Sequence, residues 1–248
     1  MKSVCFLFFI FFASSSIVSA QNDGRIVYRI STERLSIDDN ESQAKQKVYK
    51  LLNSLSRIRD SLYFHLDYSN SESLFYLNKN KNIGMSNEKG YNSVVRSFNT
   101  VYYVNNETGN IIEQTISDGN YLVTSSTDEM NWDTTKEKKI IDGYLCFKAI
   151  TNIKAQSLTK GEYLKKIEAW YCPSLPLNIG PKMYGNLPGL IMELIDGKLT
   201  YYVDSMDLNP KFKIQIDKPN NGKKISKKDY LSRQPKITKD NFEEYIGN

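Results

Sequence analysis

The sequence predicts a mainly β protein of the α+β kind, a curved antiparallel sheet or half-open barrel that carries one long amphipathic helix. Three observations predict this fold. Apolar and polar residues alternate along most of the chain, as they do in half-buried strands. Short connections rich in Gly, Asn and Asp join these stretches, and connections this short demand antiparallel neighbours. Only residues 40–60 or so have apolar side chains at helical spacing.

The composition agrees with a folded domain. The chain has 248 residues, of which 40% are apolar and 25% charged, with a net charge of +5 at pH 7. These proportions exclude collagen-like and wholly disordered proteins. The chain has no internal repeat and no linker, so we expect one domain over residues 21–210, followed by a basic segment over residues 211–248.

Residues 1–20 are predicted to be a secretory signal peptide. Lys2 precedes an apolar run over residues 4–13, which is too short to span a bilayer. The small residues of Val18-Ser19-Ala20 then favour cleavage before Gln21. We expect the mature protein to be exported to the periplasm, or to the extracellular space, and not to be transmembrane, because no second apolar run of membrane length follows.

The mature chain is expected to begin with a strand and a helix. Residues 25–37 are rich in Ile, Val, Tyr and Thr and have mixed alternation, as a long strand would. Asp38, three residues before Glu41, predicts a helix N-cap. The apolar residues that follow at helical spacing are Ala44, Val48, Leu51, Leu52, Leu55 and Ile58. They predict a helix of about five turns that covers an apolar surface.

A meander of short strands is expected after the helix. The expected strands are residues 62–68, 74–77, 97–104, 110–116, 121–125, 144–151, 163–172 and 190–195, with a partner for the last over 198–203. Asp196-Gly197 is a favoured two-residue hairpin turn. With that turn, one face of the final hairpin is wholly apolar: Leu190, Met192, Leu194, Leu199, Tyr201 and Val203. One helix cannot cover such a sheet, which must therefore curl on itself or leave a groove.

The two cysteines of the mature chain fit opposite positions of a hairpin. If Cys146 faces Cys172, the turn centres on residue 159, inside the Ser, Thr, Lys and Gly segment at 156–161. The same register places Lys148 opposite Trp170. An even pair of cysteines in an exported chain is more often bridged than free, so we expect a disulfide. Two buried free thiols are the alternative.

No motif indicates catalysis. His65 is the only histidine, and alternation places it on one strand face with Tyr63 and Asp67. No Ser stands in a Gly-x-Ser-x-Gly elbow, so a Ser-His-Asp hydrolase has no support. A transition-metal site lacks ligands, and no phosphate loop or dinucleotide motif occurs. We expect no catalytic residue, no metal and no cofactor, with a hydrolase of unrecognised type as the alternative.

Two other segments invite a functional reading. Residues 171–191 hold four of the seven prolines, so this stretch is either a rigid crossover or a binding rim, and Leu187-Pro188-Gly189 predicts a type II turn. Residues 211–239 hold ten Lys or Arg and two Asp. They are either a solvated surface or a surface that binds anionic lipid head groups or another acidic partner; export makes nucleic acid an improbable partner.

The same Pro-rich region carries a family resemblance. Gly180-Pro181 and then Asn186-Leu187-Pro188-Gly189-Leu190-Ile191 resemble the GLPGLI family of exported proteins from Gram-negative bacteria, and Trp132 and residues 137–149 and 169–173 resemble its other signatures. Asn186 stands where the family has its first Gly, which suggests a position that tolerates a side chain. Cys172 stands where the family usually has a small polar residue, so a bridge would be peculiar to this member. The resemblance implies no assigned activity and no catalytic residues.

The order of strand, helix and meander is similar to the carrier-like half-open sheet of periplasmic lipoprotein and lipid carriers. We therefore expect a non-enzymatic periplasmic protein that binds an apolar ligand, such as a lipid, or a protein partner. The alternative is an envelope structural or assembly factor that docks through residues 211–239 onto an envelope protein or surface. The identity of the ligand or partner and the presence of a cavity in the sheet stay open.

Overall fold

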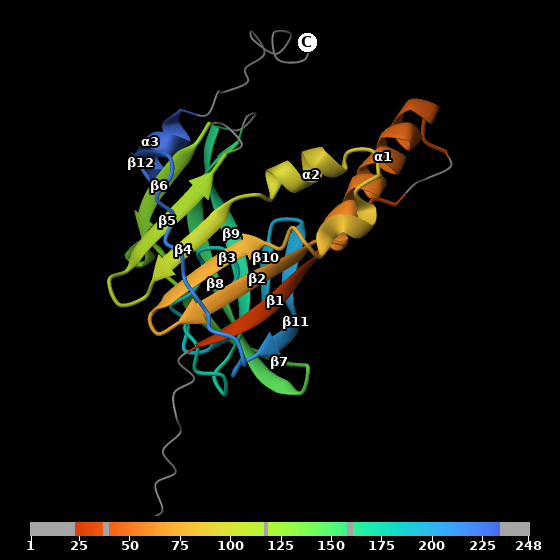
Figure 1. Ribbon diagram of the computed structural model, residues 1–248. Helices are drawn as coiled ribbons and strands as arrows, with labels where there is room; N and C mark the ends of the chain where they lie inside the picture. The colour runs from red at the N-terminus through yellow and green to blue at the C-terminus, as the bar shows by residue number, and fades with distance from the viewer. Residues whose placement is uncertain (1–22, 37–39, 117–118, 158–160, 234–248) are drawn as a thin grey trace, which may run out of the picture.

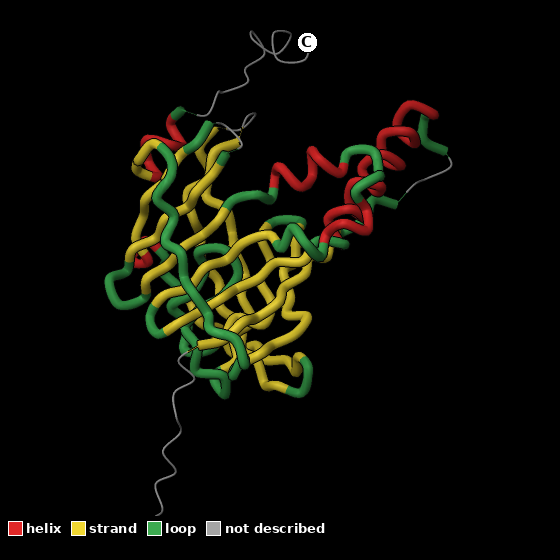
Figure 2. Tube along the Cα trace, in the orientation of Figure 1, coloured by secondary structure: helices red, strands yellow, loops and turns green. Residues whose placement is uncertain are grey.

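The computed structural model describes residues 23–36, 40–116, 119–157 and 161–233 (Figure 1). The described residues form a curved 12-stranded sheet in the order β12-β6-β5-β4-β3-β2-β1-β11-β10-β9-β8-β7, which confirms the mainly β class (Figure 2). The strands are β1 Asp23–Thr32, β2 Tyr63–Ser69, β3 Glu72–Leu77, β4 Val101–Asn105, β5 Asn110–Thr115, β6 Tyr121–Ser126, β7 Asp133–Ile141, β8 Tyr144–Ser157, β9 Gly161–Cys172, β10 Leu190–Asp196, β11 Leu199–Asp207 and β12 Lys223–Ser226. The helices are α1 Gln43–Asp60, α2 Tyr91–Ser97 and α3 Lys227–Ser232, with 3-10 turns at Asn82–Met85 and Thr127–Glu129.

The strand pairing is antiparallel except where β12 runs parallel to β6. The sequence did not predict β7, β12, α2 or α3. Strand β7 escaped because it is an edge strand whose side chains are mostly exposed, so it has no apolar face to reveal it. The predicted signal peptide at residues 1–20 lies outside the described residues, as does Asp38. No helix in the described ranges is both long and apolar enough to cross a membrane.

One face of the sheet, called the inner face below, carries the core. Its side chains include Ile26, Tyr28, Phe64, Phe75 and Leu194, each no more than 2% exposed. These residues come from β1, β2, β3 and β10, which lie within five consecutive strands of the sheet although β10 is far from the others in the sequence. Burial of this face supplies the main driving force for folding, since apolar area removed from water stabilises the fold by about 25 cal/mol per Å².

The β8–β9 hairpin has the predicted register. Lys148 lies opposite Trp170 and Phe147 opposite Tyr171, which places Cys146 and Cys172 at facing positions. The predicted disulfide, however, is not formed: both cysteines are buried free thiols. Each has a local partner instead, because Cys146 Sγ donates to Tyr144 O at 3.6 Å and Cys172 Sγ lies 3.0 Å from Ser174 Oγ. Burial, and then the neighbouring Cys172, raises the pKa of Cys146 to about 12.

The turn of the β10–β11 hairpin lies one residue later in the chain than predicted, which shifts the partner of each paired residue by two. Asp196 pairs with Leu199, so the turn residues are Gly197 and Lys198 rather than Asp196 and Gly197. Gly197 has a φ of 68° and Lys198 has no positive φ, which fits a type II′ turn with Gly at its first central position. Asp196 stays in the strand because its carboxylate is buried between two lysines. A shift of two keeps every side chain on its predicted face.

Helix α1 begins at Ser42, whose hydroxyl accepts a hydrogen bond from Lys45 N, and not at the predicted Asp38 cap. It projects from one end of the sheet beside α2 (Figure 1). Only Ser56 and Ile58 are buried in it. The prediction that this helix covers the sheet is therefore wrong for its N-terminal half, because its apolar side chains there face solvent.

Residues 173–189 provide the cover instead. Leu175, Ile179, Tyr184 and Leu187 are no more than 8% exposed and pack in the core against the inner face. Main-chain hydrogen bonds tie the segment to β10, with Leu190 N donating to Leu175 O and Ile191 N to Ile179 O. The predicted type II turn is absent, since Gly189 N donates to Leu187 O and closes a tighter three-residue turn. The rigid-crossover interpretation therefore describes most of this segment.

The basic segment runs across the opposite, outer face of the sheet before it reaches β12 (Figure 2). Ile214 is 4% exposed, and Lys218 Nζ lies 5.3 Å from the centre of the Tyr103 ring. Lys227 pairs with both carboxylate oxygens of Glu113, at 2.7 and 2.9 Å. Residues 211–233 are thus part of the folded domain, although most of their lysines are exposed.

Candidate functional site

A cavity of about 480 Å³ lies between the inner face and the base of α1. Its lining comes from elements that are distant in sequence: the end of β1, α1, β2, β3, the end of α2, β4 and β11. Small-molecule sites in proteins have volumes of about 300–1,000 Å³, so this cavity has the size of a ligand site. The sequence predicts a sheet that either curls on itself or leaves a groove, and this cavity corresponds to the groove.

Aromatic rings form one wall of the cavity. Phe64 and Phe75 stack in parallel with their centroids 5.3 Å apart. Tyr201 meets both rings edge-on at 5.8 and 6.2 Å, and Phe98 meets Phe64 edge-on at 5.9 Å. Tyr102 completes the group through an edge contact with Phe75 at 6.3 Å. Rings that lock one another in this way make a rigid apolar wall.

A lysine from the Pro-rich segment closes the cavity on another side. Lys182 Nζ lies 2.5 Å from Asp196 Oδ2 and 4.9 Å from the centre of the Tyr201 ring. Lys165 of β9 pairs with the other oxygen of Asp196. Two ammonium groups therefore share one carboxylate, which leaves one positive charge uncompensated within this cluster, called the Lys182 cluster below.

The ionisation of the Lys182 cluster follows from its surroundings. Burial by itself would lower the pKa of Lys182, but the Tyr201 and Tyr102 hydroxyls and Asp196 outweigh it, and the pKa is raised. Burial would likewise raise the pKa of Asp196, but Lys182 and Lys165 outweigh it, and the pKa is lowered. Both groups are therefore charged at neutral pH.

The rest of the lining adds to the positive charge. Arg59 and Lys198 line the cavity together with one acidic residue, Glu33. With Lys182, three cationic side chains face one anionic side chain around an aromatic wall. Such a site suits a ligand with an apolar body and an anionic group.

The residues singled out for the family resemblance have structural roles in the segment that leads into β10. Gly189 approaches the main chain so closely that a Cβ there would lie 2.1 Å from Cys172 O. Gly180 is packed against Ile191, and Pro181 O accepts from Tyr184 N. Asn186 has a φ of 60°, a left-handed conformation that favours Gly and that Asn tolerates best among other residues, which explains an Asn where the family has Gly.

The remaining motif residues, Leu187, Pro188, Leu190 and Ile191, lie at the entry to β10, and none of them lines the cavity. Leu187, Leu190 and Ile191 are no more than 2% exposed. Among residues 173–189, only Lys182 lines the cavity, and the motif does not contain it.

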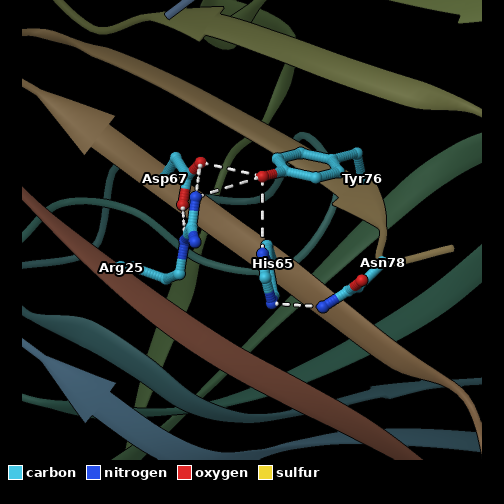
Figure 3. Close-up of polar contacts among 5 residues, drawn as sticks. All are labelled: Arg25, His65, Asp67, Tyr76 and Asn78. Carbon is cyan, nitrogen blue, oxygen red and sulfur yellow. Dashed lines mark hydrogen bonds and ion pairs between the residues drawn. The ribbon is translucent and has the colours of Figure 1, made fainter. Parts of the chain in front are cut away.

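His65 lies on the outer face, in a second groove of about 610 Å³ (Figure 3). Asn78 Nδ2 donates to His65 Nε2 at 2.8 Å, which assigns the proton of the neutral ring to Nδ1, 3.4 Å from the Tyr76 hydroxyl. Tyr76 donates to Asp67 at 2.9 Å, and Arg25 binds Asp67 through two hydrogen bonds of 2.6 and 2.8 Å. The predicted neighbourhood of His65 and Asp67 exists, but Tyr76 lies between them.

The polar side chains of this outer network form hydrogen bonds with one another. Burial, and then the charge of Arg25, lowers the pKa of His65 to about 4, so the ring is neutral at neutral pH. Burial, and then Asp67, raises the pKa of Tyr76 to about 12. Both ring nitrogens of His65 are engaged within the network, and Asp67 already holds an arginine. The arrangement orders the strands β1, β2 and β3 and offers no poised base.

In the ranges that the structure describes, no three His, Cys, Asp or Glu side chains gather as metal ligands would.

The comparisons with known proteins give a family of unknown function and a distant fold likeness. A family model described as "Protein of unknown function (Porph_ging)" matches residues 154–193, which run from the end of β8 into β10. No curated protein matches the chain.

Two crystal forms of one protein, "Structure of PNGF-II in P21 space group" and "Structure of PNGF-II in C2 space group", resemble the structure with TM-scores of 0.52 and 0.50 and identities of 19% and 18%. Each alignment covers 85% of this chain and about a third of the other, 32% and 33%. This chain thus spans about a third of the length of PNGF-II, and at these identities the likeness concerns the fold alone. The Mycobacterium tuberculosis lipoprotein LppX aligns at 10% identity, over 79% of this chain and 90% of its own, with a TM-score of 0.28, which is too low to support an inference.

Sequence reasoning missed the residues that make the cavity. From the sequence alone, nothing distinguishes Phe64, Phe75 and Tyr201 from ordinary core residues. Nor does anything mark Lys182 as more than one lysine in a Pro-rich loop. One signal was available: Lys182 is the only charged residue between Pro173 and Ile191, an otherwise neutral segment bound for the interior. A lone charge in such a segment needs a buried partner or a ligand.

Proposed function

We propose that this protein is an exported, non-enzymatic binding protein for an apolar ligand that carries an anionic group. The observation that carries the proposal is the aromatic cavity of about 480 Å³ beside the Lys182 cluster. We also propose that the chain is a GLPGLI protein, since the signature residues 180–191 lie within the matched family stretch.

The chemistry of the wall selects the ligand class. An alkyl chain or a ring that enters the cavity leaves water and packs against a lining that includes Phe64, Phe75 and Tyr201, which favours association at about 25 cal/mol per Å² of apolar area. A carboxylate or phosphate at its end would accept a charge-assisted hydrogen bond from Lys182, whose ammonium is held by Asp196 and Tyr201. A neutral ligand of equal length gains only the first contribution.

Dodecanoate and dodecanol provide the test, because they share the alkyl chain and differ in charge. In isothermal titration at neutral pH, below the critical micelle concentration, we expect dodecanoate to bind about tenfold more tightly, since one hydrogen bond to a charged group contributes about 1.5–3 kcal/mol. Lys182→Asn should reduce that preference to less than about threefold. Asn is suitable there because Lys182 has a φ of 58°, which Asn tolerates.

Lys213→Asn is the matched control, since Lys213 is an exposed lysine on the opposite face of the sheet. It should leave both affinities unchanged. The proposal fails if neither compound binds the wild-type protein, or if Lys182→Asn keeps the full preference for dodecanoate.

A further inference from the structure

Helix α1 has an apolar stripe that nothing in the described structure covers. Val48, Leu51 and Leu52 are 52%, 50% and 37% exposed, and with Leu55 they lie at positions i, i+3, i+4 and i+7, on one face. Toward its C-terminal end the helix is anchored, because Leu55 and Ile58 pack on the core. The first turns project beyond the sheet, as Figure 1 shows.

The charged side chains of α1 are nearly all positive. The helix carries Lys45, Lys47, Lys50, Arg57 and Arg59, and its one acidic residue is Asp60, the last. At about 100° of rotation per residue, Lys45 and Lys47 lie on either side of the apolar stripe. Lys45 pairs with Glu41 at 2.9 Å, but both side chains are solvent-accessible and such a pair contributes little.

These features match one partner better than others. Three apolar side chains on a projecting helix cannot supply the roughly 1,200–2,000 Å² of a stable protein interface, and two copies of so basic a helix would repel each other. An apolar stripe flanked by lysines is the pattern of helices that lie in the headgroup region of a bilayer, where anionic lipids attract the lysines.

We propose that α1 docks this protein on the surface of a bilayer containing anionic lipids, with Val48 and Leu51 inserted among the acyl chains. Leu52, Asn53, Ser56 and Arg59 of the same helix line the cavity, so docking brings the part of the cavity wall that α1 forms close to the membrane. That an amphiphile then passes between bilayer and cavity rests on the ligand-binding function proposed above; docking itself does not.

Vesicle flotation tests the docking. Vesicles of phosphatidylglycerol and phosphatidylcholine in equal parts should bind the wild-type protein, and pure phosphatidylcholine vesicles or 0.5 M salt should weaken binding several-fold. Leu51→Glu should lower the affinity for the mixed vesicles by about tenfold or more, because it replaces an apolar side chain that enters the acyl region with a charged one. Leu164→Glu, at a β9 position that is 67% exposed, should leave binding unchanged.

Two further measurements separate the explanations. Leu51 is 50% exposed, so the circular dichroism spectrum and urea midpoint of Leu51→Glu should match the wild type and show that the variant is folded, whether or not dodecanoate binds. Neither Val48 nor Leu51 lines the cavity, so any dodecanoate affinity should also be unchanged. Loss of flotation by the folded variant supports docking; flotation that persists in Leu51→Glu overturns it. Sedimentation of the wild type as a dimer that Leu51→Glu dissociates would also overturn it, in favour of a second copy as the partner.

Discussion

The inner face of the sheet is completed in two different ways. At one end the segment 173–189 fills the curve of the sheet, with Trp132 Nε1 donating to Gly185 O at 2.8 Å and the Tyr28 hydroxyl donating to Ile191 O at 2.6 Å. At the other end the rings of Phe64, Phe75 and Tyr201 border a cavity. Both ends use the same long strands, so the difference lies in what the chain places against them.

The boundary between the two ends is Lys182. The residues of the filling segment on either side of it are largely apolar or backbone-bonded, whereas Lys182 extends a charge to Asp196 at the edge of the cavity. We infer that this charged cluster keeps the cavity open. A cavity that was only a packing defect would need no charged cluster at its edge.

Gly189→Ala should break the filled end with the largest effect. Its Cβ would lie 2.1 Å from Cys172 O and 2.8 Å from Pro173 N, which are main-chain atoms, and the φ of 152° suits glycine only. We expect the free energy of unfolding to fall by about 4 kcal/mol or more, or expression to fail. Urea unfolding measures it, and a variant as stable as the wild type would contradict the described path of this segment.

Asp196→Asn should act next, at the boundary. It leaves Lys182 and Lys165 without their carboxylate, and breaking a buried pair costs about 3 kcal/mol even where one partner is partly exposed. Because the folded pKa of Asp196 is lowered, its contribution is present above the ordinary Asp pKa of about 3.9 and is lost as the pH falls through the folded value. The difference in stability between wild type and variant should therefore be full at pH 7 and should begin to shrink as the pH falls below about 4; an equal difference at pH 3 and pH 7 would rule this out.

Two substitutions that each enlarge a side chain, one at either end, are expected to have the smallest effects on stability. Gly180→Ala adds one carbon in the filled end, 2.7 Å from Ile191 Cδ1, and should cost about 1–3 kcal/mol of stability. Thr100→Leu adds a larger group to the lining of the cavity and should cost less than about 1 kcal/mol, while it weakens dodecanoate binding. Thermal unfolding of the two variants side by side measures the difference. If Thr100→Leu lowers the stability more than Gly180→Ala does, the region assigned to the cavity is packed and the cavity is absent.

Local patterns predicted the strands and much of their pairing. The facing positions of Cys146 and Cys172 placed the β8–β9 register correctly. Alternation placed Leu194 and Tyr201 on the core face, even though the predicted β10–β11 turn was one residue early and its partners were therefore shifted by two. Periodicity of two is insensitive to that error because a shift by two preserves the face.

What local patterns could not predict is which surfaces meet. The apolar stripe of α1 was expected to cover the sheet, because the sequence shows that a surface is apolar but not what packs against it. For the same reason the segment 173–189 was interpreted either as a rigid crossover or as a binding rim. The cavity joins Phe64, Lys182 and Tyr201 through tertiary packing alone. The free thiols of Cys146 and Cys172 could not be told from a bridge by register, since facing positions permit both.

The most direct test of ligand binding is nuclear magnetic resonance of the protein with ¹³C-labelled dodecanoate. We predict intermolecular nuclear Overhauser contacts between the methylene protons of the ligand and the ring protons of Phe64, Phe75 and Tyr201, at a stoichiometry of one. Contacts with Tyr76 in the outer groove, or no contacts under conditions where titration detects binding, would contradict the assignment of the cavity as the site.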